Sequence, residues 1–226
     1  MTKRLSNERS CVAVGQVCDR KLGSRREREV ITEIYLVRHA DSNYSSGDEA
    51  TRTLSERGRI DALTVTELLL KERIQAVYSS PYVRAVQTVE GIADRLRVTI
   101  DLDERFRERE FAQFDSIVTD PFEAMERGFI EPHFALPGGE SIRDVELRGI
   151  SAINEVLQKH NGKRVAIGIH GGIMTVIMHH FDTQFDANFL RQLPKPDIRK
   201  LSFKNANFVG AEKVGTFGDK SVSKST

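Results

Sequence analysis

Short apolar runs alternate with longer amphipathic stretches from residue 31 onward, and this alternation limits the folds that the chain can adopt. The runs ITEIYLV (31–37), IQAVYS (74–79), RVTID (97–101) and RVAIGI (164–169) are typical of buried strands. The stretches between them repeat apolar residues with helical spacing. Strands that alternate with helices favour a mostly parallel sheet covered on both faces. We therefore expect an α/β fold, a three-layer α/β/α sandwich with a small cap over the carboxyl-terminal edge of its sheet.

Helix boundaries and the end of the sheet can also be predicted. Ser55 is the expected N-cap of a helix over residues 54–73, and a second helix is expected over 82–96. Ser141 and Asp144 have the spacing of a capping box, so a long helix should follow PGGES (137–141). The run KLSFKN (200–205) is expected to form the last strand, at an edge of the sheet.

The length of 226 residues suits one large domain with extensions. Residues 1–32 contain eight Lys or Arg, four Asp or Glu and no aromatic residue, so they can bury little and should form a flexible extension. We expect the main domain over residues 33–210, with a cap insertion at 106–136. Residues 211–226 should form a C-terminal tail.

Charge and composition argue against several classes of function. The net charge of +1 gives no general attraction to nucleic acid or to a membrane surface. No apolar stretch is long enough to span a bilayer, and the first thirty residues lack the apolar core of a signal peptide. The two cysteines, Cys11 and Cys18, match no common zinc or redox spacing. We expect a cytoplasmic protein that binds neither nucleic acid nor membrane.

Reactive side chains follow three of the predicted strands. Arg38 and His39 follow the first, Arg84 lies in the first turn of the helix after the second, and His170-Gly171 follows the fourth. A parallel sheet brings these strand ends to one edge. Arginine forks match phosphate oxygens, and a glycine-flanked helix N-terminus offers free backbone N–H groups to an anion. The pattern predicts a phosphate pocket that contains two imidazoles.

A neutral histidine nitrogen can attack phosphorus and form a covalent phosphoenzyme, and the leaving group then needs a proton from an acid. The segment DERFRERE (103–110) offers Glu104, Glu108 and Glu110. We favour Glu108, because the charge of a bound phosphate would keep a neighbouring carboxyl group protonated. A neighbouring carboxylate remains the alternative.

The remaining histidines are interpreted as structural or surface residues: His133, His160, His179 and His180. The sequence contains no HExxH or comparable ligand spacing. We therefore expect neither a metal site nor a cofactor.

Six segments occur in an order that resembles one known family. They are LVRHADS (36–42), TLSERGRIDA (53–62), YSSPYVRAVQT (78–88), FRERE (106–110), PGGES (137–141) and IHGG (169–172). Together they resemble the histidine phosphatase superfamily, in the branch of the phosphoglycerate mutases and related bacterial phosphatases, over about residues 33–204. The resemblance implies that His39 is the phosphorylated nucleophile and that Glu108 is the acid and then the base.

The same resemblance implies that Arg38, Arg84 and His170 bind the phosphoryl group, and the glycine-flanked helix start adds Gly171. An asparagine common in the family is replaced by Ser45, but Ser42 can still contribute a phosphate contact. The tyrosine-glycine and paired-arginine elements that seat the substrate in the mutases are missing, which favours hydrolysis over mutase action.

We therefore expect a metal-independent phosphomonoester hydrolase that works through phosphohistidine on a small phosphorylated substrate. A phosphoprotein is the alternative substrate. A phosphoglycerate mutase-like phosphomutase and a catalytically silent phospho-ligand binding module are the alternative functions. No pattern in the sequence indicates an oligomeric state.

Overall fold

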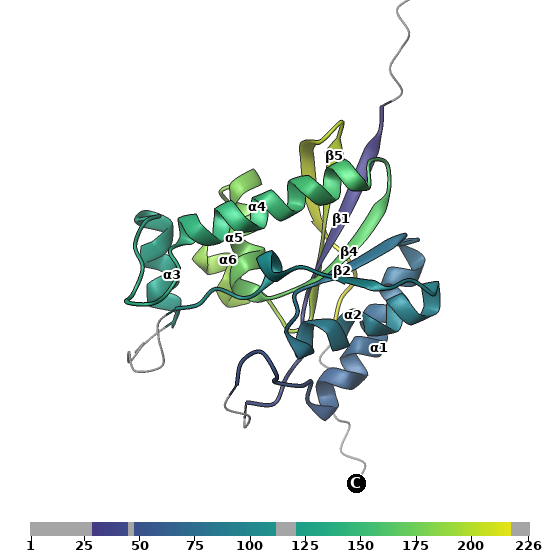
Figure 1. Cartoon of the computed structure of the whole chain (residues 1–226), viewed down its shortest axis with the longest axis horizontal. Coiled ribbons are helices and arrows are strands. Elements are labelled where there is room, and N and C mark those ends of the chain that lie inside the picture. Colours follow the sequence, from purple (N-terminus) through teal and green to yellow (C-terminus); the bar gives the residue numbers. More distant parts are fainter. Residues whose placement is uncertain (1–28, 45–47, 112–120, 218–226) are drawn as a thin grey trace, which may run out of the picture.

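A single six-stranded sheet organises the chain (Figure 1). The structure is a computed structural model and describes residues 29–44, 48–111 and 121–217. The strand order is β3–β2–β4–β1–β5–β6. The strands are β1 (Ile31–Arg38), β2 (Ala76–Ser79), β3 (Ile100–Leu102), β4 (Arg164–Ile169), β5 (Asp197–Lys204) and β6 (Asn207–Lys213). The first four strands pair in parallel, so the expected mostly parallel α/β sheet is confirmed.

Helices cover both faces of this sheet (Figure 1). α1 and α2 lie on one face, whereas α4, α5 and α6 lie on the other, and α3 packs against α4 and α6. The helical segments are α1 (Glu56–Lys71), α2 (Val83–Leu96), the short 3₁₀ helix η1 (Glu104–Phe106), α3 (Pro121–Ile130), α4 (Ile142–Lys159), α5 (Gly171–Phe181) and α6 (Ala187–Gln192). The three-layer arrangement is the one that the alternation of apolar runs predicts.

The predicted helix caps are present. Ser55 Oγ accepts a hydrogen bond from the backbone N–H of Gly58 at 3.0 Å, at the start of α1. At the start of α4, Ser141 Oγ accepts from the Asp144 N–H at 3.1 Å, and the Asp144 carboxylate accepts from the Ser141 N–H at 3.0 Å. These bonds satisfy backbone donors that the first helical turn leaves free.

Alternate residues of β1 point into two separate cores. Ile34 and Leu36 are buried among side chains of α4 and α5, whereas Tyr35 and Val37 are buried among side chains of α1 and α2. Successive strand residues face opposite sides of a sheet, so a strand covered on both sides has to be apolar throughout. Each fully buried side chain of this size contributes about 1.5–3 kcal/mol. This burial fixes the position of the strand end that carries Arg38.

The expected place of KLSFKN is wrong. Residues 200–204 belong to β5, which pairs with β1 in the antiparallel direction and is followed by β6 at the edge. Asn205 and Ala206 form the tight turn between the two strands, with φ values of 48° and 64°. The sequence after this turn, NFVGAEK, has too few apolar residues to be recognised as a strand, because an edge strand is only partly covered.

The sheet begins at Ile31 and ends at Lys213. Residues 1–28 of the expected extension, 112–120 of the expected cap and 218–226 of the expected tail lie outside the described residues. Phe106, at the start of the expected cap, is fully buried in the core beside α4 and α5. Within the described ranges, no helix has the length and apolar character that crossing a bilayer requires.

Candidate active site

Three polar residues directly follow three neighbouring parallel strands. His39 follows β1, Ser80 follows β2 and His170 follows β4. The backbone ladder extends to the first two, because the N–H of His39 donates to Ile169 O at 2.9 Å and that of Ser80 donates to Gly168 O at 2.8 Å. The ring centroids of His39 and His170 are 5.3 Å apart. The carboxyl-terminal edge of the sheet therefore brings the two imidazoles together.

Both nitrogens of the buried His39 ring have partners. Nδ1 lies 2.7 Å from the carbonyl oxygen of Ala40, which can only accept, so we assign the ring proton to Nδ1. Nε2 then carries the lone pair and accepts a hydrogen bond from Nε of Arg84 at 3.2 Å. Burial, and next the positive charge of Arg84, hold the pKa of His39 well below its usual value. The ring is neutral at physiological pH.

His170 is fully buried between Ser80 and Tyr82. Its Nε2 lies 2.8 Å from Ser80 Oγ, and the Tyr82 ring packs edge-on with a centroid distance of 5.0 Å. Burial holds the pKa of His170 well below its usual value, and electrostatic interaction with the His39 ring and with Arg84 lowers it further. Nδ1 is buried and has no hydrogen-bond partner in the described part of the chain. When Ser80 donates to Nε2, the ring proton sits on Nδ1 and is available to an acceptor.

Arg38 lies against the start of α5. Its Nη1 donates to the carbonyl of Leu193 and, at 3.4 Å, to that of Pro194. A Cβ atom added to Gly171 would stand 2.9 Å from Nη2 of Arg38, so only glycine leaves room for the guanidinium. Burial lowers the pKa of Arg38, and the negative charge of Glu108 opposes that shift. Gly171 therefore positions this arginine beside His170.

An exposed carboxylate bridges two buried arginines. Glu49 accepts from Nη2 of Arg84 at 3.0 Å and from Nη1 of Arg52 at 2.8 Å. The Glu49 side chain is 63% exposed, whereas those of Arg84 and Arg52 are 1% and 8% exposed. Two guanidinium groups that already hold a carboxylate have the spacing to hold another oxyanion. The sequence analysis identified neither Glu49 nor Arg52.

The carboxylate of Glu108 rests on the N-terminus of α5. Oε2 accepts from the N–H of Gly172 and Oε1 from that of Ile173, both at 3.0 Å, and Oε1 also accepts from the Arg109 N–H at 2.9 Å. A Cβ atom added to Gly172 would stand 2.6 Å from Oε1. The sequence analysis expected these backbone donors to face the phosphate, but two of them hold Glu108. The helix start therefore places this carboxyl group beside His170.

Ser42 is the remaining residue that the sequence analysis selected. It is buried, and its backbone forms an isolated bridge with Leu54. Within the described residues, Ser42 Oγ has no hydrogen-bond partner, and neither do Nε of Arg38 and Nε of Arg52. Buried polar atoms are nearly always partnered, so these potential donors call for an acceptor. An oxygen-rich anion would supply it.

Two further residues support the site from α2. Thr88 Oγ1 accepts from the Ala40 N–H at 3.1 Å and donates to Arg84 O at 2.7 Å. Gln87 Oε1 accepts from the Leu54 N–H at 2.9 Å. The bonds to Ala40 and Leu54 connect the segment after β1 to α2, the helix that carries Arg84. Both residues lie in the segment YSSPYVRAVQT, whose sequence alone indicates no role for them.

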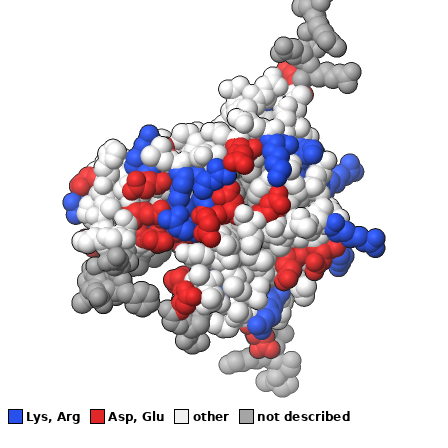
Figure 2. Space-filling view, viewed as in Figure 1, with Lys and Arg blue, Asp and Glu red and all other residues white. Residues whose placement is uncertain are grey.

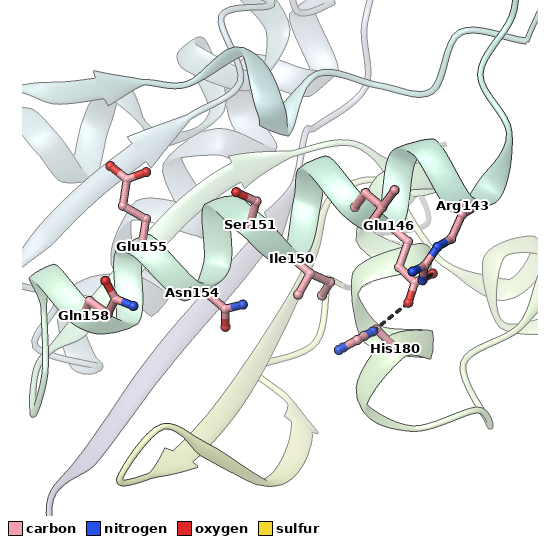
Figure 3. Close-up of a pocket in the computed structure, with 9 residues that line it drawn as sticks. Arg143, Glu146, Ile150, Ser151, Asn154, Glu155, Gln158 and His180 are labelled. Atoms are coloured by element: carbon pink, nitrogen blue, oxygen red, sulfur yellow. Dashed lines mark hydrogen bonds and ion pairs between the residues drawn. The ribbon is translucent and has the colours of Figure 1, made fainter.

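Two of the other histidines make structural contacts. His160 Nε2 lies 3.0 Å from the Tyr78 hydroxyl. His180, at the opposite end of α5 from His170, pairs with Glu146 at 2.7 Å in a hollow that is otherwise lined by residues of α4 (Figure 3). Among the residues that the structure describes, no group of three or more His, Cys, Asp or Glu side chains could hold a metal ion.

The two arginines, Arg38 and Arg84, give the site a strong positive charge. Arginines keep their positive charge at any physiological pH, so Arg38 and Arg84 favour a dianionic ligand. The two rings are neutral, and one of them presents an unprotonated nitrogen. A site of this kind can bind a phosphoryl group and attack it.

Comparison with known proteins agrees with this geometry. A family model described as the histidine phosphatase superfamily (branch 1) matches residues 34–210. The chain is 30% identical over 164 residues to a metal-independent phosphoserine phosphatase of Arabidopsis thaliana, covering 65% of this chain and 67% of that protein. It is 23% identical over 163 residues to a glucosyl-3-phosphoglycerate phosphatase of Mycolicibacterium vanbaalenii, covering 65% and 72%. The structure of Bacillus stearothermophilus YhfR superposes with a TM-score of 0.64 at 25% identity, covering 79% of this chain and 94% of that one.

Proposed function

The chain belongs to the histidine phosphatase superfamily, and we propose that it hydrolyses phosphate monoesters of small molecules through a phosphohistidine formed on His39. The observation that carries the proposal is the geometry around that ring, whose Nδ1 faces the carbonyl of Ala40 and whose Nε2 faces Arg84. His39 is neutral, and its lone pair on Nε2 lies 3.2 Å from the guanidinium Nε of Arg84. A nucleophile thus stands next to a phosphate-binding group, and the proposed reaction needs no metal ion.

In the first step, Arg84 releases Nε2 and donates to a phosphoryl oxygen instead. Nε2 attacks phosphorus, the ester P–O bond breaks, and its electron pair stays on the leaving oxygen. Protonated Glu108 gives that oxygen its proton. Arg38 and Nδ1 of His170 hold the charge that spreads over the other phosphoryl oxygens.

In the second step, the Glu108 carboxylate takes a proton from water. The water oxygen attacks phosphorus, the P–N bond breaks, and its electron pair returns to Nε2 of His39, so that inorganic phosphate leaves. The backbone N–H groups of Gly172 and Ile173 support the charged carboxylate between the two steps. The negative charge of Glu108 also reaches Arg84, where it opposes the lowering of the pKa that burial causes.

The charges around His39 support a small substrate with a second anionic group. Arg52 lies beside Arg84, and Lys195, which donates to the Tyr44 hydroxyl at 2.5 Å, contributes to the low pKa of His39. The relatives named above are phosphatases of phosphoserine and of glucosyl-3-phosphoglycerate. A phosphoprotein is the alternative substrate. Action in the cytoplasm is part of the proposal, supported by the low cysteine content of two residues.

Release of phosphate and trapping of the intermediate test this function. A panel of phosphate monoesters, with and without carboxylates and including a phosphoserine peptide, is incubated with the protein in the presence of a chelator. Rapid acid-free quenching with ³²P-labelled substrate should give an acid-labile, base-stable label on the protein. His39→Asn should lose both label and turnover.

Turnover that survives His39→Asn would exclude this mechanism. Transfer of the label between hydroxyl groups of one substrate, with little free phosphate, would indicate a phosphomutase. Tight binding of phosphorylated ligands without turnover would indicate a binding module.

A further inference from the structure

The loop that carries Glu108 has little regular structure of its own. It follows η1 directly and runs over residues 107–110. The N-terminus of α5 bonds the side-chain carboxylate of Glu108 and not the backbone of this loop. Other contacts therefore have to hold the loop backbone in place. An acid that is misplaced by about 1 Å can lose about 10²-fold in rate, so the position of this loop matters for the proposed reaction.

Arg148, from the middle of α4, supplies these contacts. Its Nη1 donates to the carbonyls of Arg105 at 2.7 Å and Arg107 at 2.8 Å, and its Nη2 donates to that of Glu108 at 3.3 Å. Nε and Nη2 donate to the two carboxylate oxygens of Glu140 at 2.8 Å and 2.9 Å. A guanidinium has five N–H groups, and these five bonds use all of them.

Glu140 continues the same network on the other side of the loop. Its carboxylate accepts from Nη2 of Arg107 at 2.9 Å and from the Glu110 N–H at 3.2 Å. Its backbone carbonyl accepts from Nε of Arg109 at 2.9 Å. Burial raises the pKa of Glu140, but hydrogen bonding and the charge of Arg148 outweigh this, so its pKa lies below the usual value. The carboxylate stays charged at neutral pH and keeps its donors.

The pair lies within a larger set of charged contacts where η1 meets α4. On that face, acidic and basic side chains are interspersed (Figure 2). The Arg148 and Glu140 side chains are only 12% and 14% exposed, whereas Arg143 and Glu146 of an ordinary pair on the same helix are 44% and 22% exposed. Buried bidentate bonds to charged groups are stronger than exposed ion pairs.

We propose that Arg148 is a positioning residue for the acid step, acting through the backbone of the loop that carries Glu108. This inference rests on the proposed role of Glu108. Because all five N–H groups of Arg148 are bonded to the loop and to Glu140, none is left to contact a phosphoryl group. Its removal should therefore impair proton donation to the leaving group and leave phosphate binding intact.

Leaving groups of different basicity separate these effects. The 4-nitrophenolate ion departs without a proton, whereas the alkoxide of an alkyl phosphate needs one. The value of kcat/KM is measured for 4-nitrophenyl phosphate and for glycerol 2-phosphate, together with Ki for inorganic phosphate. The variants are Arg148→Lys, which has three donors in place of five, Glu140→Gln, and Glu108→Gln as the reference.

For Arg148→Lys we expect kcat/KM on glycerol 2-phosphate to fall by about 10²-fold, against less than about threefold on 4-nitrophenyl phosphate. Glu140→Gln should show the same imbalance to a smaller degree, and Ki for phosphate should not change. Arg143→Gln removes the exposed pair on the same helix and should keep the wild-type ratio of the two substrates.

Equal losses on the two substrates would overturn the positioning role and leave a purely structural one. Thermal unfolding identifies a variant that fails to fold. If either Arg148→Lys or Glu140→Gln fails to fold, the substrate ratio of the other variant tests the proposal. If Glu108→Gln itself keeps the wild-type ratio, the proposed acid is wrong. If Glu108→Gln changes the ratio and neither folded variant of the Arg148–Glu140 pair does, only the positioning proposal fails.

Discussion

Nε of Arg84 donates to Nε2 of His39 at 3.2 Å, so the resting protein covers its proposed nucleophile with a side chain that also has to bind the substrate. The bond keeps the lone pair directed at a cation until a phosphoryl group arrives. The same guanidinium is held from its other side by Glu49. Binding of a phosphate therefore requires Arg84 to exchange partners.

Arg84→Lys tests the planar fork of this side chain. Lysine keeps the charge but cannot donate to several oxygens in one plane, so kcat/KM should fall by about 10²-fold, the loss typical of one transition-state donor. Steady-state kinetics on 4-nitrophenyl phosphate measures the loss. Arg95→Lys changes an exposed arginine of the same helix and should have no effect. Wild-type kinetics in Arg84→Lys would remove Arg84 from the phosphate pocket.

Glu49→Gln tests competition between the resident carboxylate and the substrate. Removing the negative charge frees Arg84 and Arg52, so Ki for inorganic phosphate should decrease by about two- to fivefold, the range of an exposed ion pair. Competitive inhibition by phosphate measures the change. Glu67→Gln removes a similarly exposed acid that pairs with Arg95 and serves as the control. Weaker phosphate binding in Glu49→Gln would mean that Glu49 supports the arginines and does not compete.

Gly172→Ala tests the contact between α5 and the proposed acid. The added Cβ would stand 2.6 Å from Oε1 of Glu108, so the carboxylate has to move. We expect about a 10²-fold loss of kcat/KM on an alkyl phosphate. The unfolding midpoint should not fall, because alanine is the better helix former. Gly210→Ala, where no atom lies within 4 Å of the added Cβ, is the matched control. Unchanged kinetics in Gly172→Ala would show that the proposed acid step does not depend on the contact between Glu108 and the start of α5.

Stability should decrease as the pH falls below the ordinary pKa of histidine. Burial, followed by neighbouring charge, keeps the pKa of His39 and of His170 well below its usual value in the folded protein. In the unfolded chain the two histidines titrate near pH 6.5, so below this pH the unfolded state binds more protons than the folded state does. Each ring therefore contributes stability that is present above pH 6.5 and is lost below it, with a slope of up to about 1.4 kcal/mol per pH unit.

Urea unfolding at pH 7.5, 6.5 and 5.5 measures this slope. Buried carboxylates such as Glu140 also have a lowered pKa, but their contribution is lost only below about pH 4.3, outside this range. His39→Asn should reduce the slope, because one of the rings is gone. A slope that is identical in both proteins would show that His39 titrates normally.

The sequence predicts those features that neighbouring residues determine. One such feature is the buried strand that ends at Arg38 and leads into His39, and another is the capping box of Ser141 and Asp144. Each depends only on residues of one short segment, and both are present in the structure. The choice among three carboxylates was open for the opposite reason. Only Glu108 reaches the start of α5, which lies far along the chain, while Glu110 pairs with Arg107 at the surface.

Contacts between distant segments account for what the sequence analysis missed. The bridge from Glu49 to Arg84 joins a loop to a helix, and neither segment indicates the other. The direction and place of β5 depend on which strand edge is still free when it pairs, so its own residues could not reveal them. Arg148 is one of two arginines on α4, and the sequence does not distinguish it from Arg143 until its partners in the loop are known.

The pairing of β1 with β4 has a consequence for refolding. These neighbours stand at the centre of the sheet, although one ends at Arg38 and the other begins at Arg164. Contacts between such distant segments form late and slowly, because a long loop has to close first. Neither half of the polypeptide can hold both imidazoles, so catalytic activity that returns after dilution from denaturant measures closure of this central ladder and not the earlier gain of helix.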